Sequence, residues 1–217
     1  PFLQERIEHE RAALGPEFVK ADQVWHPRAD RPENPNLPAL YRRAERMVED
    51  LRPRVVSGAS RGGAVDDDVA LYEDLVFYVL FYRYFDDFFA LVRDRSGAAR
   101  RVDFYDRFAH DLEHYLAAAG LKAGDDAPHL FACFFQVRRG FHFIHRNILG
   151  GSLPAARLRA AVWQSIFTRD IKRYRRGLYR HMGDVTTLVT GPSGTGKELV
   201  ARAVALSRYI PFDPATR

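Results

Sequence analysis

Apolar and polar positions repeat along most of this chain with the spacing of amphipathic α-helices. Apolar residues recur three or four positions apart with charged residues between them, which places one face of each helix against a core. Helices are predicted over residues 2–14, 40–51, 69–93, 102–119, 128–149 and 154–179. Gly15-Pro16, Pro53, Gly120 and Gly150-Gly151 are expected to end four of them. The four prolines between His26 and Pro38 predict an extended loop.

The predicted helix over residues 69–93 is the most apolar of these. Apolar side chains nearly surround it, which is typical of the central helix of a bundle, and its charged residues, Arg83, Asp86 and Asp87, argue against a membrane span. Its aromatic residues are expected in the core, and a small-molecule pocket among them is the alternative. Three aspartates, Asp66 to Asp68, precede it, and adjacent helical residues point in different directions. Favourable interaction with the helix dipole therefore explains them better than a metal site does.

A different pattern closes the chain. Thr186 to Thr190 is β-branched and apolar, the glycine-rich turn Gly191-Pro192-Ser193-Gly194-Thr195-Gly196 follows, and Lys197 starts an alanine-rich helical pattern. Strand, glycine-rich loop and helix in this order are what a phosphate-binding loop requires. The residues expected to contact the nucleotide here are Gly191, Ser193, Gly194, Thr195, Gly196, Lys197, Glu198 and Leu199.

The residue types of this turn suit phosphate chemistry. Glycines allow backbone angles that turn successive N–H groups inward, and Lys197 adds a positive charge at the start of the next helix. Glu198 stands where most phosphate-binding loops carry a Ser or Thr hydroxyl for magnesium. The alternative is a glycine-rich turn that merely precedes a helix.

The run from Gly191 to Ala203 resembles the ATP-binding loop of sigma-54-dependent transcriptional activators, the bacterial enhancer-binding proteins, whose AAA+ domain also carries glutamate after the lysine. Pro192 departs from the glutamate usual in that family. Upstream, Ile148-Leu149-Gly150-Gly151-Ser152 resembles the segment that opens this AAA+ domain, where backbone near the first glycine lies against adenine. The resemblance thus implies that Ile148, Leu149 and Gly150 also contact the nucleotide. A helix end followed by a serine cap explains the same residues about equally well.

The resemblance implies two domains, a helical regulatory or sensor domain over residues 1–147 and the truncated start of an α/β AAA+ P-loop domain over residues 148–217. The expected fold class is therefore mainly α, with an N-terminal helical bundle. The family's full-length proteins form homo-oligomeric rings, hydrolyse ATP with Mg²⁺ and remodel sigma-54 RNA polymerase. They contact DNA through a C-terminal domain that is missing here.

The chain ends before the acidic motif, the arginine fingers and the sigma-contacting loop of that family. Because phosphoryl transfer needs a positioned water and charge stabilisation, this chain is expected to bind nucleotide weakly and turn it over negligibly, and no catalytic residue is assigned. One alternative is a non-catalytic helical interaction module with a remnant loop. A different P-loop ATPase or kinase is disfavoured by Glu198, which lacks the magnesium-binding hydroxyl.

Composition limits the remaining possibilities. Of 217 residues 47% are hydrophobic, which is ample for a core, and the single cysteine, Cys133, excludes an internal disulfide and predicts a buried, inert thiol. The net charge of +5 fits an acidic partner or nucleic acid but is too small to establish either. The arginine-rich segment 169–180 is interpreted as a solvated face in preference to a phosphate-tracking helix.

No metal site or membrane segment is predicted. The histidine pairs His110/His114 and His142/His145 share helix faces, but neither has an acidic partner at ligand spacing. No apolar run approaches the length needed to cross a bilayer, so a cytoplasmic protein is expected.

Overall fold

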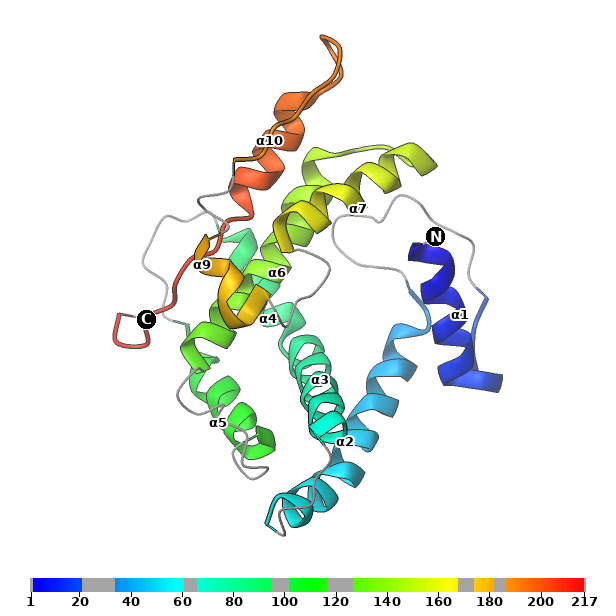
Figure 1. The fold of residues 1–217 in the computed structure, drawn as a ribbon, viewed down its shortest axis with the longest axis vertical. Helices are drawn as coiled ribbons and strands as arrows, with labels where there is room; N and C mark the ends of the chain where they lie inside the picture. Colours follow the sequence, from blue (N-terminus) through cyan, green and yellow to red (C-terminus); the bar gives the residue numbers. More distant parts are fainter. Residues whose placement is uncertain are drawn as a thin grey trace. The chain divides into compact units, whose positions relative to one another are not determined.

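The computed structural model describes residues 2–20, 34–60, 66–94, 102–116, 127–167, 174–181 and 186–216. These residues form helices and connecting segments, and none of them forms a β-strand, so the fold is mainly α (Figure 1). The chain divides into two compact units. The first contains α1, α2, α3 and α5, and the second contains most of α4 together with α6, α7, α9 and α10.

The first unit is a set of packed helices. They are α1 (Phe2–Leu14), the 3₁₀ turn η1 (Gly15–Glu17), α2 (Leu37–Ser60), α3 (Asp66–Arg83) and α5 (Tyr105–Leu116). Helix α3 packs against both α2 and α5. The core consists of fully buried apolar side chains from these three helices, among them Val48, Val76, Leu80, Phe108 and Leu112. This arrangement follows from the predicted periodicity, because each of these residues lies on the apolar face of its helix.

Helix α2 is longer than expected, since it continues through Pro53 to Ser60. A proline inside a helix removes one backbone hydrogen bond and clashes with the preceding turn, which costs about 3 kcal/mol. Here the apolar face continues on both sides of the proline, with Val48 and Val55 both buried. The prediction that Pro53 limits the helix was therefore wrong, and tertiary packing is the physical reason.

The segment before α2 is described only in part. Residues 26–33 of the predicted loop lie outside the described residues, and Pro38 falls in the first turn of α2, where the missing N–H has no helical partner to lose. Asn36 is buried and holds the chain after η1, because its side chain accepts from Val19 N at 2.8 Å and donates to Val19 O at 2.9 Å.

The apolar stretch 69–93 forms two helices instead of one. Helix α3 ends at Arg83, Tyr84 is a turn, and α4 runs from Phe85 to Arg93. Most of α4 belongs to the second unit, so this stretch supplies core residues to two units. That explains why apolar residues occur on nearly all sides of the predicted helix. The side chains of Asp66 to Asp68, which open α3, lie outside the described residues.

The second unit contains α6 (Ala127–Asn147), α7 (Leu153–Phe167), the π-turn η4 (Tyr174–Leu178), α9 (Tyr179–His181) and α10 (Lys197–Leu206). The predicted helix 154–179 is thus seen as α7 and η4, while residues 168–173 lie outside the described part. A buried cluster joins α6, α7, η4 and α10, and it consists of Ile144, Ile148, Val162, Ile166, Phe167, Tyr174 and Ala203. The predicted domain boundary at residue 147 falls inside this unit, and the assignment of an AAA+ domain from residue 148 stays a prediction.

Within the described residues, no helix is long and apolar enough to cross a membrane.

Candidate nucleotide-binding site

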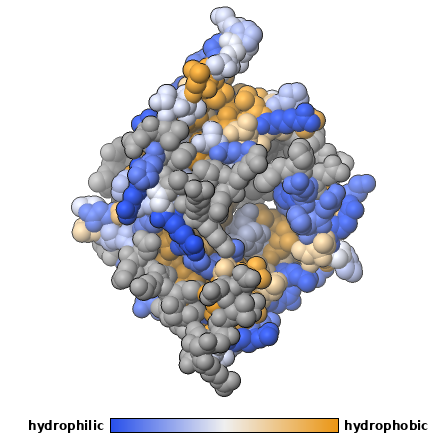
Figure 2. All heavy atoms as spheres, viewed as in Figure 1, coloured by the Kyte–Doolittle hydropathy of each residue, from blue (hydrophilic) through white to orange (hydrophobic). Residues whose placement is uncertain are grey.

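The glycine-rich turn forms a loop that leads directly into α10. Gly194 and Gly196 adopt φ angles of 79° and 77°, which residues with a Cβ rarely tolerate, and Gly196 is the residue immediately before the helix. Figure 1 shows the loop as a narrow turn extending beyond the N-terminal end of α10. In Figure 2 its tip is pale, neither strongly hydrophilic nor hydrophobic, as expected of Gly, Pro, Ser and Thr. Gly194 and Gly196 therefore adopt backbone angles of the kind that the sequence predicts for glycines in this turn.

Lys197 closes this loop. Its ammonium group donates to the carbonyl oxygens of Gly191, at 3.0 Å, and Pro192, at 2.7 Å. The Thr195 hydroxyl donates to Pro192 O at 2.8 Å, so two side chains hold the start of the loop against its end. An ammonium group has three donors, and these two carbonyls leave one for an anion.

The electrostatics of the loop favour an anion. The unpaired N–H groups at the start of α10 carry partial positive charge, and Lys197 adds a full charge at the same place. Glu198, in the first turn of α10, is exposed, as are Ser193 and Gly194. Leu199 is 43% exposed, and its backbone N–H already donates to Gly196 O at 3.0 Å. The N–H groups suited to phosphate are thus those of the loop itself, between Gly191 and Lys197.

The predicted strand before the loop has no sheet around it. Thr186 to Thr190 is irregular backbone, and no described residue forms a strand with it. Leu188 in this segment is 84% exposed. An apolar β-branched segment gains stability as a strand only when it pairs and buries its side chains, and neither occurs here. The mainly α fold is present, whereas the α/β core expected around the loop is not among the described residues.

The second predicted contact, Ile148 to Gly150, is a tight turn between α6 and α7. Ile148 is buried, Leu149 is 69% exposed, and Gly150 has a φ of 120°. Arg159 of α7 is buried and donates through Nη1 to both Ile148 O and Gly150 O at 3.0 Å. Burial lowers the pKa of the Arg159 guanidinium. This arginine fixes the shape of the turn.

The turn also has the features of an ordinary helix boundary. Helix α6 ends at Asn147, and the Ser152 hydroxyl accepts from Ala155 N at 3.4 Å at the start of α7. The backbone of Ile148 is used within the protein, because its N–H donates to Ile144 O and its carbonyl accepts from Arg159. The carbonyl of Gly150 accepts from the same guanidinium, so Arg159 holds both ends of this segment.

Helix α10 connects these two segments. Ile148 and Ala203 belong to the same buried cluster, against which Val200 and Val204 also pack. Ala203 lies six residues after Lys197, about 9 Å along the helix axis. The carbonyls of Ile148 and Gly150 accept from Arg159, whereas Lys197 donates to carbonyls of its own loop. The Ile148–Gly150 turn and, through α10, the loop are therefore both connected to this buried cluster, and each is stabilised by its own hydrogen bonds.

A buried chain of hydrogen bonds fixes the far end of α10. Tyr174 donates to Gln136 Oε1 at 2.8 Å, Gln136 donates to Ser207 O at 3.0 Å, and Ser207 donates to Ala203 O at 2.6 Å. All three side chains are buried. Burial, as the main cause, raises the pKa of Tyr174 to about 12. These three hydrogen bonds attach α10 to α6 and η4.

Neither the role of Arg159 nor the hydrogen bonds joining Tyr174, Gln136 and Ser207 were identified from the sequence. Arg159, Val162 and Ile166 are spaced three and four apart, so the arginine occupies a position of the buried stripe of α7. An arginine in an otherwise apolar stripe is a signal that a buried charge has a partner, and it could have indicated the contact to the turn.

Over the described ranges, no group of three or more His, Cys, Asp or Glu side chains could hold a metal ion. Of the predicted histidine pairs, His142 is buried, and His145 hydrogen-bonds through Nδ1 to Phe141 O. Cys133 is buried and forms no disulfide, and its sulfur lies 3.6 Å from His129 Nε2. The basic segment predicted over residues 169–180 is described only from Tyr174 onward.

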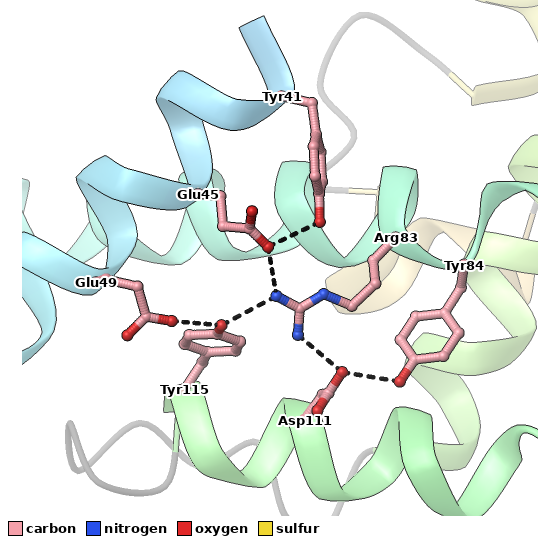
Figure 3. Close-up of polar contacts among 7 residues, drawn as sticks. All are labelled: Tyr41, Glu45, Glu49, Arg83, Tyr84, Asp111 and Tyr115. Atoms are coloured by element: carbon pink, nitrogen blue, oxygen red, sulfur yellow. Dashed lines mark hydrogen bonds and ion pairs between the residues drawn. The ribbon is translucent and has the colours of Figure 1, made fainter. Parts of the chain in front are cut away.

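The first unit contains a separate polar cluster around Arg83 (Figure 3). Arg83 donates to Asp111 at 2.9 Å, to Glu45 at 2.8 Å and to the Tyr115 hydroxyl at 3.2 Å. Burial alone would lower the pKa of Arg83, but hydrogen bonds to Tyr41, Asp111, Tyr115 and Glu45 raise it above its ordinary value. The cluster joins α2, α3 and α5, and its side chains satisfy one another, so we assign it a structural role.

No family model matches the chain, and no curated protein or solved structure is significantly similar to it.

Proposed function

We propose that this chain binds ATP through the loop Gly191–Lys197, as the regulatory and nucleotide-binding portion of a sigma-54-dependent transcriptional activator. One observation carries the proposal: the Lys197 ammonium lies across the loop, between the carbonyls of Gly191 and Pro192, at the positive end of α10. A phosphate seated in the loop meets this ammonium and the loop N–H groups together. The specific family rests on the sequence resemblance alone.

The proposal assigns a role to each part of the site. The loop N–H groups and Lys197 hold the β- and γ-phosphates, and the turn at Leu149 and Gly150 lies beside the base. Mg²⁺ would bind through the phosphate oxygens, and Glu198 stands where most phosphate-binding loops carry a magnesium-binding hydroxyl. In the full-length activator, ATP hydrolysis by a ring of such subunits would drive remodelling of sigma-54 RNA polymerase. The helical first unit would regulate that ATPase.

Titration of a fluorescent ATP analogue with the whole chain tests the proposal. Lys197→Ala is expected to weaken binding at least tenfold, because a charge-assisted contact to phosphate contributes about 1.5 to 3 kcal/mol. Lys20→Ala is the matched control, since Lys20 is an exposed lysine of the first unit. This variant should bind the ATP analogue as tightly as the unchanged protein does. Equal binding by Lys197→Ala would refute the assignment.

The alternative is an interaction module in which the loop is a remnant. In its favour, Lys197 and Thr195 already donate hydrogen bonds to carbonyls of the loop, so the loop is stabilised without a ligand. In addition, Thr186–Thr190 forms no strand with any described residue. This alternative predicts that the unchanged protein does not bind the ATP analogue either.

A further inference from the structure

A group of aromatic rings gathers beside α6 in the second unit. The ring of His129 lies 4.1 Å from that of Tyr179 and 5.6 Å from that of Tyr209, and the two tyrosine rings are 4.7 Å apart. His129 Nε2 donates to Arg175 O at 2.8 Å, because a carbonyl can only accept. In the neutral ring Nδ1 then accepts from the Tyr209 hydroxyl at 2.7 Å. The hydroxyl bond and the ring contact hold the half-buried Tyr209 beside His129, and ring contacts hold the half-buried Tyr179 there.

Arg180 and Arg208 are the sequence neighbours of Tyr179 and Tyr209. Arg180 Nε donates to the Tyr179 hydroxyl at 2.8 Å, and Arg139 donates to Arg208 O at 3.1 Å. Arg176, Arg180 and Arg208 are exposed. We call the whole group the arginine–tyrosine surface, and it consists of His129, Arg139, Arg175, Arg176, Tyr179, Arg180, Arg208 and Tyr209. It brings the chain on either side of α10 together with α6.

The charge of this half of the sequence is strongly one-sided. Residues 127–217 contain 15 Lys and Arg but four Asp and Glu, a net charge of +11, whereas residues 1–126 contain 18 against 24, a net charge of −6. No acidic residue occurs between Ala127 and Arg169. The total net charge of +5 therefore combines an acidic first part with strongly basic residues 127–217, whose electrostatic field attracts polyanions.

We propose that the arginine–tyrosine surface binds single-stranded nucleic acid. The arginines contact the phosphates, and the rings of Tyr179 and Tyr209 stack against unpaired bases. A single strand fits better than a duplex, because bases can reach a tyrosine face only when they are unpaired. This activity goes beyond ATP binding and uses none of the residues of the loop.

The test is fluorescence anisotropy with a labelled oligo-dT of about 20 nucleotides and the whole chain, without nucleotide, over about 50 to 200 mM KCl. Arg176→Ala/Arg180→Ala/Arg208→Ala is expected to weaken binding at least tenfold and to reduce the slope of log K against log salt by about 2, since each lost phosphate contact removes about 0.7. The matched control, Arg42→Ala/Arg43→Ala/Arg46→Ala, removes three exposed arginines of α2 and should change neither quantity.

A second pair of variants tests the stacking. Tyr209→Leu is expected to weaken binding several-fold with an unchanged salt slope, and Tyr209→Phe, which keeps the ring but loses the hydroxyl, should bind like the unchanged protein. Circular dichroism verifies that each variant is folded. The proposal is overturned if the unchanged protein does not bind at about 50 mM KCl, if both arginine triples lose affinity equally, or if a duplex of the same length binds as tightly.

Discussion

Replacing Arg83 by methionine removes the cation at the centre of the polar cluster of the first unit while keeping a side chain of similar length. The change deletes the ion pairs to Asp111, at 2.9 Å, and Glu45, at 2.8 Å. The side chains of Arg83, Asp111 and Glu45 are 28%, 22% and 37% exposed, so solvent screens both pairs in part. A fully exposed pair contributes about 0 to 1 kcal/mol and a buried hydrogen bond to a charged group about 1.5 to 3.

Taking an intermediate value of about 1 to 1.5 kcal/mol for each pair, we expect Arg83→Met to lower the free energy of unfolding by about 2 to 3 kcal/mol. Urea denaturation followed by circular dichroism measures this difference. Arg42→Met, at an exposed position of α2, is the control and should stay within about 0.5 kcal/mol of the unchanged protein. If Arg83→Met were as stable as that control, the cluster would not hold α2, α3 and α5 together.

Two further predictions concern the support of α10. Gly140→Ala would place a Cβ 2.7 Å from the buried ring of Phe167, and we expect a net loss of about 1 to 2 kcal/mol in urea denaturation, whereas Gly177→Ala, with nothing within 4 Å, should cost nothing. Tyr174 titrates near 10 when unfolded and at about 12 when folded, so its contribution to stability is complete below pH 10 and is lost as the pH rises towards 12. Between pH 9 and pH 11 the unchanged protein should lose about 1 kcal/mol more stability than Tyr174→Phe, and equal losses would contradict the assigned pKa.

Most helices could be predicted from the sequence, because a helix follows from local periodicity. The range of α1 agrees with its prediction, and α6 agrees to within two residues at each end. The errors arose where tertiary packing decided the outcome. Helix α2 passes through Pro53 because its buried face continues, and the stretch 69–93 divides at Tyr84 although it contains neither Gly nor Pro there.

In the candidate site, the conformation of the loop was predictable from the sequence, and its long-range contacts were not. The glycine conformations and the place of Lys197 at the start of α10 follow from local chemistry, which a short sequence specifies. The contact between Arg159 and the turn at Ile148 and Gly150 joins residues 9 and 11 positions apart, and it depends on how α7 packs beside the turn. A strand, likewise, requires partners that local sequence does not supply, and Thr186–Thr190 has none among the described residues.

Hydrogen exchange of the loop amides, with and without Mg-ATP, tests the central proposal most directly. If the loop N–H groups bind the phosphates, ATP should slow exchange in peptides covering Gly191 to Leu199, and the effect should disappear in Lys197→Ala. Slower exchange at Leu149 and Gly150 would add the base to the same site. If saturating ATP left exchange at Gly191 to Leu199 unchanged, the loop would not be a nucleotide site, and the interaction-module alternative would take its place.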